Sequence, residues 1–480
     1  MNAMTRTEGD SLGTVEVPAD AYWGVHTARA VANFAVTGET VGGFPRLVHA
    51  LAAVKEAAAL ANRDLGRLDG RRADAIVAAC RELRAGALAD QFPIDPIQGG
   101  AGTSTNMNAN EVVANRALEL LGHERGDYAE LDPLTHVNLG QSTNDVYPTA
   151  IRLCILTHLH ELVAGLEHLA AAFARKSEEF HDVVKMGRTQ LQDAVPMTLG
   201  QEFHTYTTML REDCARLREA AALLCESNLG GTAIGTGING HPDYARVACA
   251  HLRDITGEEV VPAGDPIEAT QDCGAFVQVS GVLKRVAVKL SKVCNDLRLT
   301  SSGPSVGFAE INLPPAQAGS SIMPGKVNPV IPEMVNQVAF EVIGNDLTVT
   351  MAAEAGQLQL NAFEPIIVYG LMRSTSHLEA AARTLADRCV DGITANREHL
   401  EQGVRGSVGI VTALSPALGY ATSAEIAKES LATGRPVGDI AVARGLLDAT
   451  RVDELLSPAA LTGLAAPVRS LPRDLDAALH

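Results

Sequence analysis

The chain has 480 residues, of which 46% are hydrophobic, and it carries a formal net charge of −18. This length gives a prior of about three domains and allows a large buried core. The acidic balance without a basic run argues against nucleic-acid binding, and no segment approaches the roughly 18 apolar residues that cross a membrane.

Helix-like segments separated by long loops dominate the first third of the chain. RLVHALAAVKEAAALANRDLG (residues 46–66) and RRADAIVAACRELRAG (residues 71–86) repeat apolar residues at helical spacing and end in glycine, as helices commonly do. We therefore expect an N-terminal helical domain over residues 1–142.

Longer helical patterns follow, and they predict a central bundle over residues 143–400. The segments with apolar residues at helical spacing are about 145–180, 197–227, 270–297, 331–355 and 366–400. Pro148 lies near the expected start of the first of them. Beyond about Glu401 the period shortens, so we expect a small C-terminal helical domain over residues 401–480. The expected fold class is all-α, in three domains.

Polar residues occur among the apolar positions near the end of the chain's long helical patterns. Because an unpaired polar side chain is costly inside a bundle, we interpret these residues as contacts between helices of different subunits. They are Asn336, Asn345, Glu354, Gln357, Gln359 and Asn361.

The eight cysteines are widely spaced and form no C-x-x-C pair or metal-type Cys/His cluster. We interpret them as reduced core residues. The N-terminal sequence MNAMTRTEGDSLG is polar, whereas a secretory signal needs an apolar segment after a basic start. A cytoplasmic protein with no membrane partner is therefore expected.

Four loops rich in hydroxyl and amide side chains are candidates for binding an anion. They are GGAGTSTNMNANE (99–111), GQSTND (140–145), GRTQLQDA (187–194) and GSSIMPGKVNP (319–329). Each lies directly before a helix-like segment, where free N–H groups and the helix dipole favour a carboxylate. The same residue types also cap helices, which is the better explanation for any single loop. Four such loops, one with a lysine, favour a carboxylate site.

The loop at 319–329 closely matches the signature of the aspartase/fumarase superfamily, and the other three loops occur in that family's order and spacing. The resemblance extends from LGTVEVPADAYWGVHTARAVANF to GSVGIVTALSP. It implies helical subunits whose long central helices form the shared core of a homotetramer, with each active site built by three subunits. It also implies a small dicarboxylate substrate, fumarate as product, no cofactor and no metal ligand.

By the same resemblance, Ser320 is the catalytic base on a mobile lid and Lys326 anchors a substrate carboxylate. The implied substrate-binding residues are Thr103, Ser142, Thr143, Asn144, Thr189, Gln190, Ser321, Lys326 and Asn328. Arg29 either assists substrate binding or forms a structural salt bridge. Glu333 either orients the neighbouring loop or only supplies an acidic first turn to its helix.

The residue after Thr189 bears on the leaving group. Superfamily members that expel hydroxide resemble one another in having a histidine there, whereas this chain has Gln190. An amide cannot titrate and so cannot act as a general acid, but a departing ammonium needs no donated proton. Gln190 therefore favours an ammonia-lyase that acts on L-aspartate. The segment AEAGQLQLNAFEP (residues 353–365) also resembles the aspartase form of its helix.

Other features keep alternatives open. Trp23 and the segment SPALGYATSAEIAKES resemble fumarases, and Leu139 and Gly140 differ from the residues expected before QSTND. The alternatives are a fumarate hydratase, a carbon–nitrogen lyase for an N-substituted aspartate, and a catalytically silent structural homologue. The intact serine and lysine of the loop at 319–329 argue against the last of these.

Overall fold

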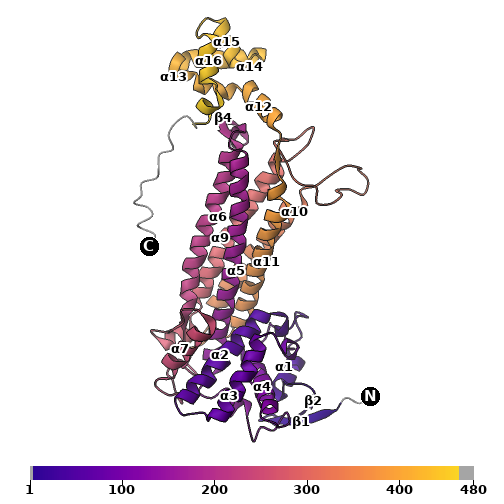
Figure 1. Cartoon of the computed structure of the whole chain (residues 1–480), viewed down its shortest axis with the longest axis vertical. Coiled ribbons are helices and arrows are strands. Elements are labelled where there is room, and N and C mark those ends of the chain that lie inside the picture. Colours follow the sequence, from indigo (N-terminus) through magenta and orange to yellow (C-terminus); the bar gives the residue numbers. More distant parts are fainter. Residues whose placement is uncertain (1–3, 464–480) are drawn as a thin grey trace. The chain divides into compact units, whose positions relative to one another are not determined.

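The computed structural model describes residues 4–463 and confirms a mainly helical fold (Figure 1). The described chain divides into two compact units, each discontinuous in sequence. The first unit comprises residues 4–165, 213–288 and 338–380, and the second comprises residues 166–212, 289–337 and 381–463. Each unit thus contains part of the predicted central domain, because both include segments of the same long helices. Residues 464–480 of the predicted C-terminal domain lie outside the described residues.

The first unit begins with a hairpin followed by shorter helices. Strand β1 (Thr5–Asp10) pairs antiparallel with β2 (Gly13–Pro18). The helices are α1 (Val25–Asn33), α2 (Pro45–Asp64), α3 (Gly70–Arg84), α4 (Thr103–Leu120), α7 (Tyr244–Thr256) and α8 (Pro266–Gln271). Two-residue strands β5 (Glu226–Ser227) and β6 (Val261–Pro262) pair in parallel. The two early predicted helices correspond to α2 and α3, and α2 packs against both α3 and α7.

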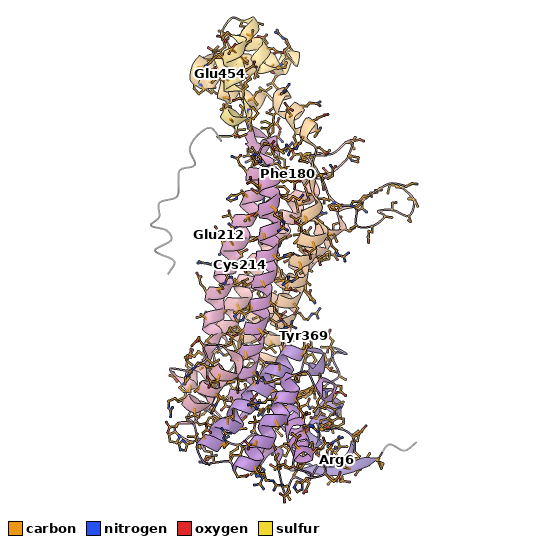
Figure 2. All side chains as sticks on the ribbon, in the orientation of Figure 1. Arg6, Phe180, Glu212, Cys214, Tyr369 and Glu454 are labelled. Atoms are coloured by element: carbon orange, nitrogen blue, oxygen red, sulfur yellow. The ribbon has the colours of Figure 1, made fainter. Side chains whose placement is uncertain are left out.

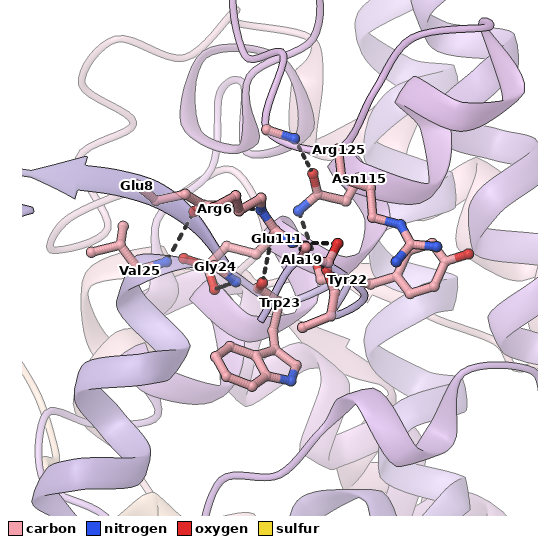
Figure 3. A network of polar contacts seen from close by, with 12 residues as sticks. Arg6, Glu8, Ala19, Tyr22, Trp23, Gly24, Val25, Glu111, Asn115 and Arg125 are labelled. Carbon is pink, nitrogen blue, oxygen red and sulfur yellow. Dashed lines mark hydrogen bonds and ion pairs between the residues drawn. The ribbon is translucent and has the colours of Figure 1, made fainter. Parts of the chain in front are cut away.

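A buried carboxylate from α4 holds the start of α1 in place (Figure 3). Glu111 accepts hydrogen bonds from the Gly24 N–H at 2.8 Å and from the N–H and hydroxyl of Thr27 at 3.2 and 2.7 Å. The Val25 N–H donates to Glu8 at 3.0 Å. Because a helix start exposes free N–H groups and the positive end of the dipole, these two carboxylates stabilise α1.

The long helices match the predicted segments closely. They are α5 (Thr143–Glu179), α6 (Leu199–Ala222), α9 (Gly274–Thr300), α10 (Val330–Glu354) and α11 (Glu364–Arg388). The prediction that the last segment continues to residue 400 is wrong. The helix ends because Cys389 adopts φ −132° and ψ −69°, outside the helical region.

Within the first unit, side-chain contacts join these five helices into a closed ring. Cys214 of α6, labelled in Figure 2, contacts α5, and each further neighbouring pair shares a hydrogen bond or ion pair. The pairs are Cys214–Val163, Arg285–Asp213, Ser280–Asp346, Asn345–Ser374 and Ser376–His158. The arrangement is the bundle expected from the helical patterns.

Helix α5 contains an 18-residue window that is apolar enough to cross a membrane, which the sequence analysis did not expect. Of that window, 78% is buried inside the structure. Length and composition do not distinguish the core helix of a bundle from a membrane-spanning helix. The burial of the window inside the structure identifies α5 as a core helix.

Three of the polar bundle residues interpreted as contacts between subunits form hydrogen bonds within the chain instead. Asn336 donates to Ser291, Asn345 donates to Ser374, and Asn361 donates to two carbonyl groups at the end of α10. These amides are therefore satisfied within one chain. The other three, Glu354, Gln357 and Gln359, are exposed.

The second unit carries short C-terminal helices and two small antiparallel strand pairs. Its strands are β3 (Val184–Thr189) and β4 (Gln192–Thr198), which pair antiparallel, and β7 (Ile311–Asn312) and β8 (Thr394–Ala395), which also do. Its short helices are α12 (Arg397–Gly406), α13 (Ser415–Leu418), α14 (Tyr420–Thr433), α15 (Val437–Ala443), α16 (Ala449–Leu455) and α17 (Pro458–Leu461). Met186 of β3 joins Ile410, Ile426 and Ile440 in their hydrophobic core.

Replacing Gly24 with alanine tests the carboxylate cap of α1. A Cβ at this position would lie 2.2 Å from a Glu8 carboxylate oxygen and 3.1 Å from Glu111, so the cap must shift. We expect Gly24→Ala to lower stability by about 1–3 kcal/mol, the usual range for overpacking. Gly70→Ala is the matched control, because a Cβ at Gly70 would meet no atom within 4 Å. Equal thermal unfolding midpoints for the two variants would contradict this account.

Candidate active site

The predicted site residues fall into groups on the two units. Ser142, Thr143 and Asn144 lie at the start of α5 in the first unit, and Thr103 begins α4 in the same unit. The second unit holds the residues at 189–190 on the β3–β4 hairpin and those of the loop at 319–329.

The start of α5 is held by a side chain that replaces a missing backbone bond. Pro148 lies inside α5 and has no N–H, so the Asn144 carbonyl lacks its usual helical partner. The Asn228 side chain donates to that carbonyl at 2.8 Å. The orphan acceptor is thereby satisfied, and the first turn of α5 keeps its position.

Ser142 and Thr143 present free hydroxyl hydrogens. The Thr143 oxygen accepts a hydrogen bond from Asn106 Nδ2 at 3.1 Å, and the Ser142 oxygen accepts one from the Asn144 N–H at 3.2 Å. A hydroxyl has one hydrogen and two acceptor lone pairs. Within residues 4–463 neither hydroxyl donates a hydrogen bond, so each hydrogen is available to an incoming acceptor such as a carboxylate.

Thr103 and Asn144 have the opposite arrangement. The Thr103 hydroxyl donates to the Gly100 carbonyl at 2.7 Å, and Asn144 Nδ2 donates to the Ala233 carbonyl at 2.7 Å. Their remaining oxygen lone pairs point to no partner among residues 4–463 and can accept a hydrogen bond. The group at the start of α5 therefore combines donors for an anion with acceptors for a cation.

Two buried charged residues support this group, and the sequence analysis missed both. Lys55 of α2 donates to Asn138 Oδ1 and Gln141 Oε1, both at 2.9 Å, and burial lowers the pKa of this ammonium to about 7. Asp145 accepts backbone hydrogen bonds, including one from Thr232 at 2.9 Å, and burial raises its pKa to about 7. A lysine within the alanine-rich run LAAVKEAAALA was the available signal.

The segment GRTQLQDA precedes α6 but not directly, because it forms the β3–β4 hairpin turn and α6 begins only after β4, at Leu199. Thr189 pairs with Gln192, and Gln190 and Leu191 between them have φ of 54° and 62°. Positive φ at both turn residues is typical of a type I′ hairpin, which usually contains asparagine and glycine. Both Thr189 and Gln190 are exposed, and within residues 4–463 no hydrogen bond engages either side chain.

A buried ion-pair cluster fixes the base of this hairpin. Glu310 is buried and pairs with Lys185 at 2.6 Å and with Arg188. Lys185 also pairs with Glu202 of α6 at 2.6 Å. A buried pair with several charge-assisted hydrogen bonds is rigid, so the cluster holds the turn that presents Gln190.

The loop at 319–329 is closed at its base and exposed at its tip. The Gly319 N–H donates to the Lys326 carbonyl at 2.8 Å, and Asn328 Nδ2 donates to the Gly319 carbonyl at 2.9 Å. A Cβ at Gly319 would lie 2.5 Å from that Lys326 oxygen, so the closure requires glycine. Ser321 and Lys326 are exposed, as their expected roles require.

Ser320 Oγ accepts hydrogen bonds from two backbone N–H groups, those of Ile322 at 3.2 Å and Met323 at 2.9 Å. Hydrogen bonds donated to a charged form favour that form. The loop therefore supplies partial positive charge where a serine alkoxide would need it.

The two supporting residues differ in their outcome. Arg29 forms a bidentate ion pair with Asp10, through Nε and Nη2 at 2.8 Å each, so its guanidinium is engaged in the structural role. Glu333 lies in the first turn of α10, and its carboxylate has no hydrogen-bond partner among the described residues. No group of three or more His, Cys, Asp or Glu side chains arranged for a metal ion occurs within residues 4–463.

Comparisons with known proteins agree with this geometry. A family model described as lyase matches residues 13–344, and one described as the fumarase C C-terminus matches residues 410–463. A protein named aspartate ammonia-lyase from Pseudomonas aeruginosa is 58% identical over 457 residues, covering 95% of this chain and 96% of that protein. One of the same name from Escherichia coli is 53% identical over 458 residues, with the same coverage.

Solved structures share the fold. A fumarate lyase:delta crystallin from Brucella melitensis, bound to cobalt, has a TM-score of 0.94 and 56% identity, covering 97% of this chain and 100% of that one. A class II fumarase from Schistosoma mansoni has a TM-score of 0.90 and 37% identity, covering 95% of this chain and 98% of that one. The chain is thus less similar to this fumarase than to the two relatives named above.

Proposed function

The chain belongs to the lyase family within the aspartase/fumarase superfamily, and on that premise we propose that it is an aspartate ammonia-lyase. This carbon–nitrogen lyase converts L-aspartate reversibly to fumarate and ammonia. The observation that carries the proposal is the similarity to relatives of that name, which are 58% and 53% identical over 95% of this chain. The hydrogen-bond arrangement at the start of α5 supports a substrate that carries both a carboxylate and an ammonium.

The substrate's β-carboxylate and ammonium bind the group in the first unit. Ser142 and Thr143 donate to the β-carboxylate, because their hydrogens are free while their oxygens already accept hydrogen bonds. The ammonium donates to the Thr103 and Asn144 oxygens, since the Thr103 hydrogen and one Nδ2 hydrogen of Asn144 are already donated to carbonyl groups. The Thr103 oxygen can only accept a hydrogen bond, so N–H groups of the loop at 319–329, rather than Thr103, complete the β-carboxylate site.

The α-carboxylate binds residues that the resemblance assigns to two other subunits. Thr189 and Gln190 contribute from the hairpin turn, and Lys326 and Asn328 contribute from the loop at 319–329. The exposure of Thr189, Gln190 and Lys326 supports this role, since a side chain that completes a neighbour's site must project from its own subunit, whereas Asn328 is half-buried.

Ser320 removes the proton from Cβ. Its alkoxide is stabilised by the N–H groups of Ile322 and Met323, and closure of the loop excludes water. The electron pair of the broken C–H bond moves onto the β-carboxylate, which becomes a doubly charged aci-carboxylate. That intermediate collapses to fumarate when the C–N bond breaks, and the nitrogen leaves as ammonia with the electron pair of that bond.

Gln190 supports ammonia rather than water as the leaving group. Hydroxide is a poor leaving group and needs a proton donor, whereas an amide side chain can only form hydrogen bonds. Fumarate hydratase remains the second candidate, favoured by the match of residues 410–463 to the fumarase C C-terminus.

We infer a homotetramer from an exposed face of α10. The face contains Phe340, Ile343, Leu347 and Met351, which are 62%, 37%, 62% and 64% exposed in the single chain. These residues recur at helical spacing, and no charged residue is exposed between positions 337 and 351. A continuous apolar stripe of this kind marks a subunit interface.

Cytoplasmic localisation is supported by eight free cysteines, of which seven are buried.

Substrate choice is the first prediction. We expect kcat/KM for deamination of L-aspartate to exceed that for dehydration of L-malate by at least about a hundredfold, or roughly 2.7 kcal/mol of transition-state preference. Fumarate absorbance gives both rates with the same purified protein. Turnover of malate as fast as that of aspartate would identify a fumarate hydratase.

The second prediction separates the base from the anchor. Ser320→Ala should lower kcat by at least about a hundredfold and leave aspartate affinity nearly unchanged, because the serine acts only in the transition state. Lys326→Ala should weaken binding by about 2–5 kcal/mol, since its partner carboxylate is charged in both states. Calorimetry with succinate measures the affinities. Equal losses of affinity in both variants would make Ser320 a structural residue.

The third prediction concerns assembly. Leu347→Asp places a charge in the apolar stripe of α10, so the tetramer should dissociate and deaminase activity should be lost. Leu431→Asp on α14 is the control, because Leu431 is also exposed but lies outside that stripe. Light scattering with size-exclusion chromatography gives the masses. A tetrameric Leu347→Asp variant would show that this face is not the interface.

A further inference from the structure

Lys55 places a buried ammonium group behind the loop that presents Ser142 and Thr143. The side chain is 0% exposed, and its Nζ donates to Asn138 Oδ1 and Gln141 Oε1 at 2.9 Å. Both acceptors are neutral amides. Among the residues that the structure describes, no carboxylate lies within ion-pair distance of this nitrogen.

Stability alone does not account for a lysine at this position. Burying a charge against neutral partners costs free energy, and an apolar side chain of similar volume would avoid that cost. The charge of Asp145 acts on Lys55 without contact, but its carboxyl is occupied by the N–H groups of Ser142, Gly230 and Thr232. Burial disfavours both charges, since it raises the pKa of Asp145 and lowers that of Lys55, so the hydrogen bonds to Asn138 and Gln141 are the contacts that support the ammonium.

A short chain of hydrogen bonds connects Lys55 to a hydroxyl of the substrate site. Asn138 Oδ1, which accepts from Lys55, also accepts from Asn106 Nδ2 at 3.3 Å. The same Asn106 nitrogen donates to Thr143 Oγ1 at 3.1 Å. The orientation of the Asn106 amide is therefore set from the Lys55 side, and it leaves the Thr143 hydrogen free.

The proposed reaction needs positive charge at this place. Proton removal from Cβ adds a second negative charge to the carboxylate that Ser142 and Thr143 bind. The hydroxyls of that subsite are neutral, and Lys326 is assigned to the other carboxylate. Stabilisation that grows as charge develops raises kcat, whereas equal stabilisation of substrate and transition state does not.

We propose that Lys55 is a positioning residue for this reaction, and the proposal rests on the proposed function. Through Asn138 and Asn106 it holds the Thr143 hydroxyl as a donor, and its charge favours the doubly charged intermediate. Lys55 does not touch the substrate.

Two variants test the proposal. Lys55→Met removes the charge and the two hydrogen bonds to Asn138 and Gln141, while the side chain keeps a similar volume. Asn138→Asp keeps the shape and the acceptor for Lys55 but places a carboxylate against the ammonium, which neutralises its charge. For each variant we expect kcat for L-aspartate to fall at least about thirtyfold with KM changed less than about threefold.

The affinities of two inhibitors distinguish a role in the reaction from a merely structural role. A structural role would weaken both inhibitors equally. Succinate resembles the ground state. A nitro analogue of aspartate, with a nitro group in place of the β-carboxylate, resembles the aci-carboxylate once it is deprotonated. Each variant should bind succinate within about threefold of wild type and bind the deprotonated nitro analogue at least about thirtyfold more weakly.

Lys176→Met is the matched control, because Lys176 is also buried but pairs with Glu179 and the Ile393 carbonyl in the second unit. Its kcat should equal that of wild type. Unchanged kcat in Asn138→Asp, failure of that variant to fold, or equal weakening of both inhibitors would overturn the proposal. Wild-type protein without aspartate deaminase activity would instead refute the proposed function, so the two failures are distinguishable.

Discussion

A hydroxyl group can hold a carboxylate only when its hydrogen is free, and the start of α5 is built around that constraint. Asn106 donates to Thr143, and the Asn144 N–H donates to Ser142, so both oxygens already accept a hydrogen bond. Thr103 and Asn144 donate to carbonyl groups instead, and their oxygens remain acceptors. Hydroxyls and amides, which can act in either sense, are thereby set as donors for an anion and acceptors for a cation in the proposed site.

Holding these groups in one state requires a polar interior. Asn228 satisfies the carbonyl that Pro148 leaves free, and the buried charges of Lys55 and Asp145 are each surrounded by hydrogen-bond partners. A buried polar network contributes little to stability on average, but its hydrogen bonds fix the orientation of its members, although Asn106 Oδ1 and Asn228 Oδ1 accept none within the described residues. The start of α5 is therefore positioned for chemistry, while the apolar interior of the bundle provides the stability.

Helical periodicity was sufficient to predict the long helices, because each buries an apolar stripe over many turns. The signature at residues 319–329 indicated the exposed Ser321 and Lys326, because both lie in one continuous segment of the sequence. Thr189 and Gln190 were found, but their hairpin was missed because a Gln-Leu turn lacks the usual Asn-Gly signal. Lys55 was missed because its partners come from residues more than 80 positions away, and one sequence contains no information on such contacts.

The central claim is that Ser142 and Thr143 bind the carboxylate that becomes doubly charged, while Ser320 is brought from another subunit. A crystal structure of the Ser320→Ala variant with L-aspartate bound tests it most directly, because this variant should hold the substrate without converting it. The account predicts the β-carboxylate within hydrogen-bond distance of Ser142 and Thr143, the ammonium at Thr103 and Asn144, and Ala at position 320 of a neighbouring subunit facing Cβ. Aspartate bound in the reverse orientation, or away from the start of α5, would contradict it.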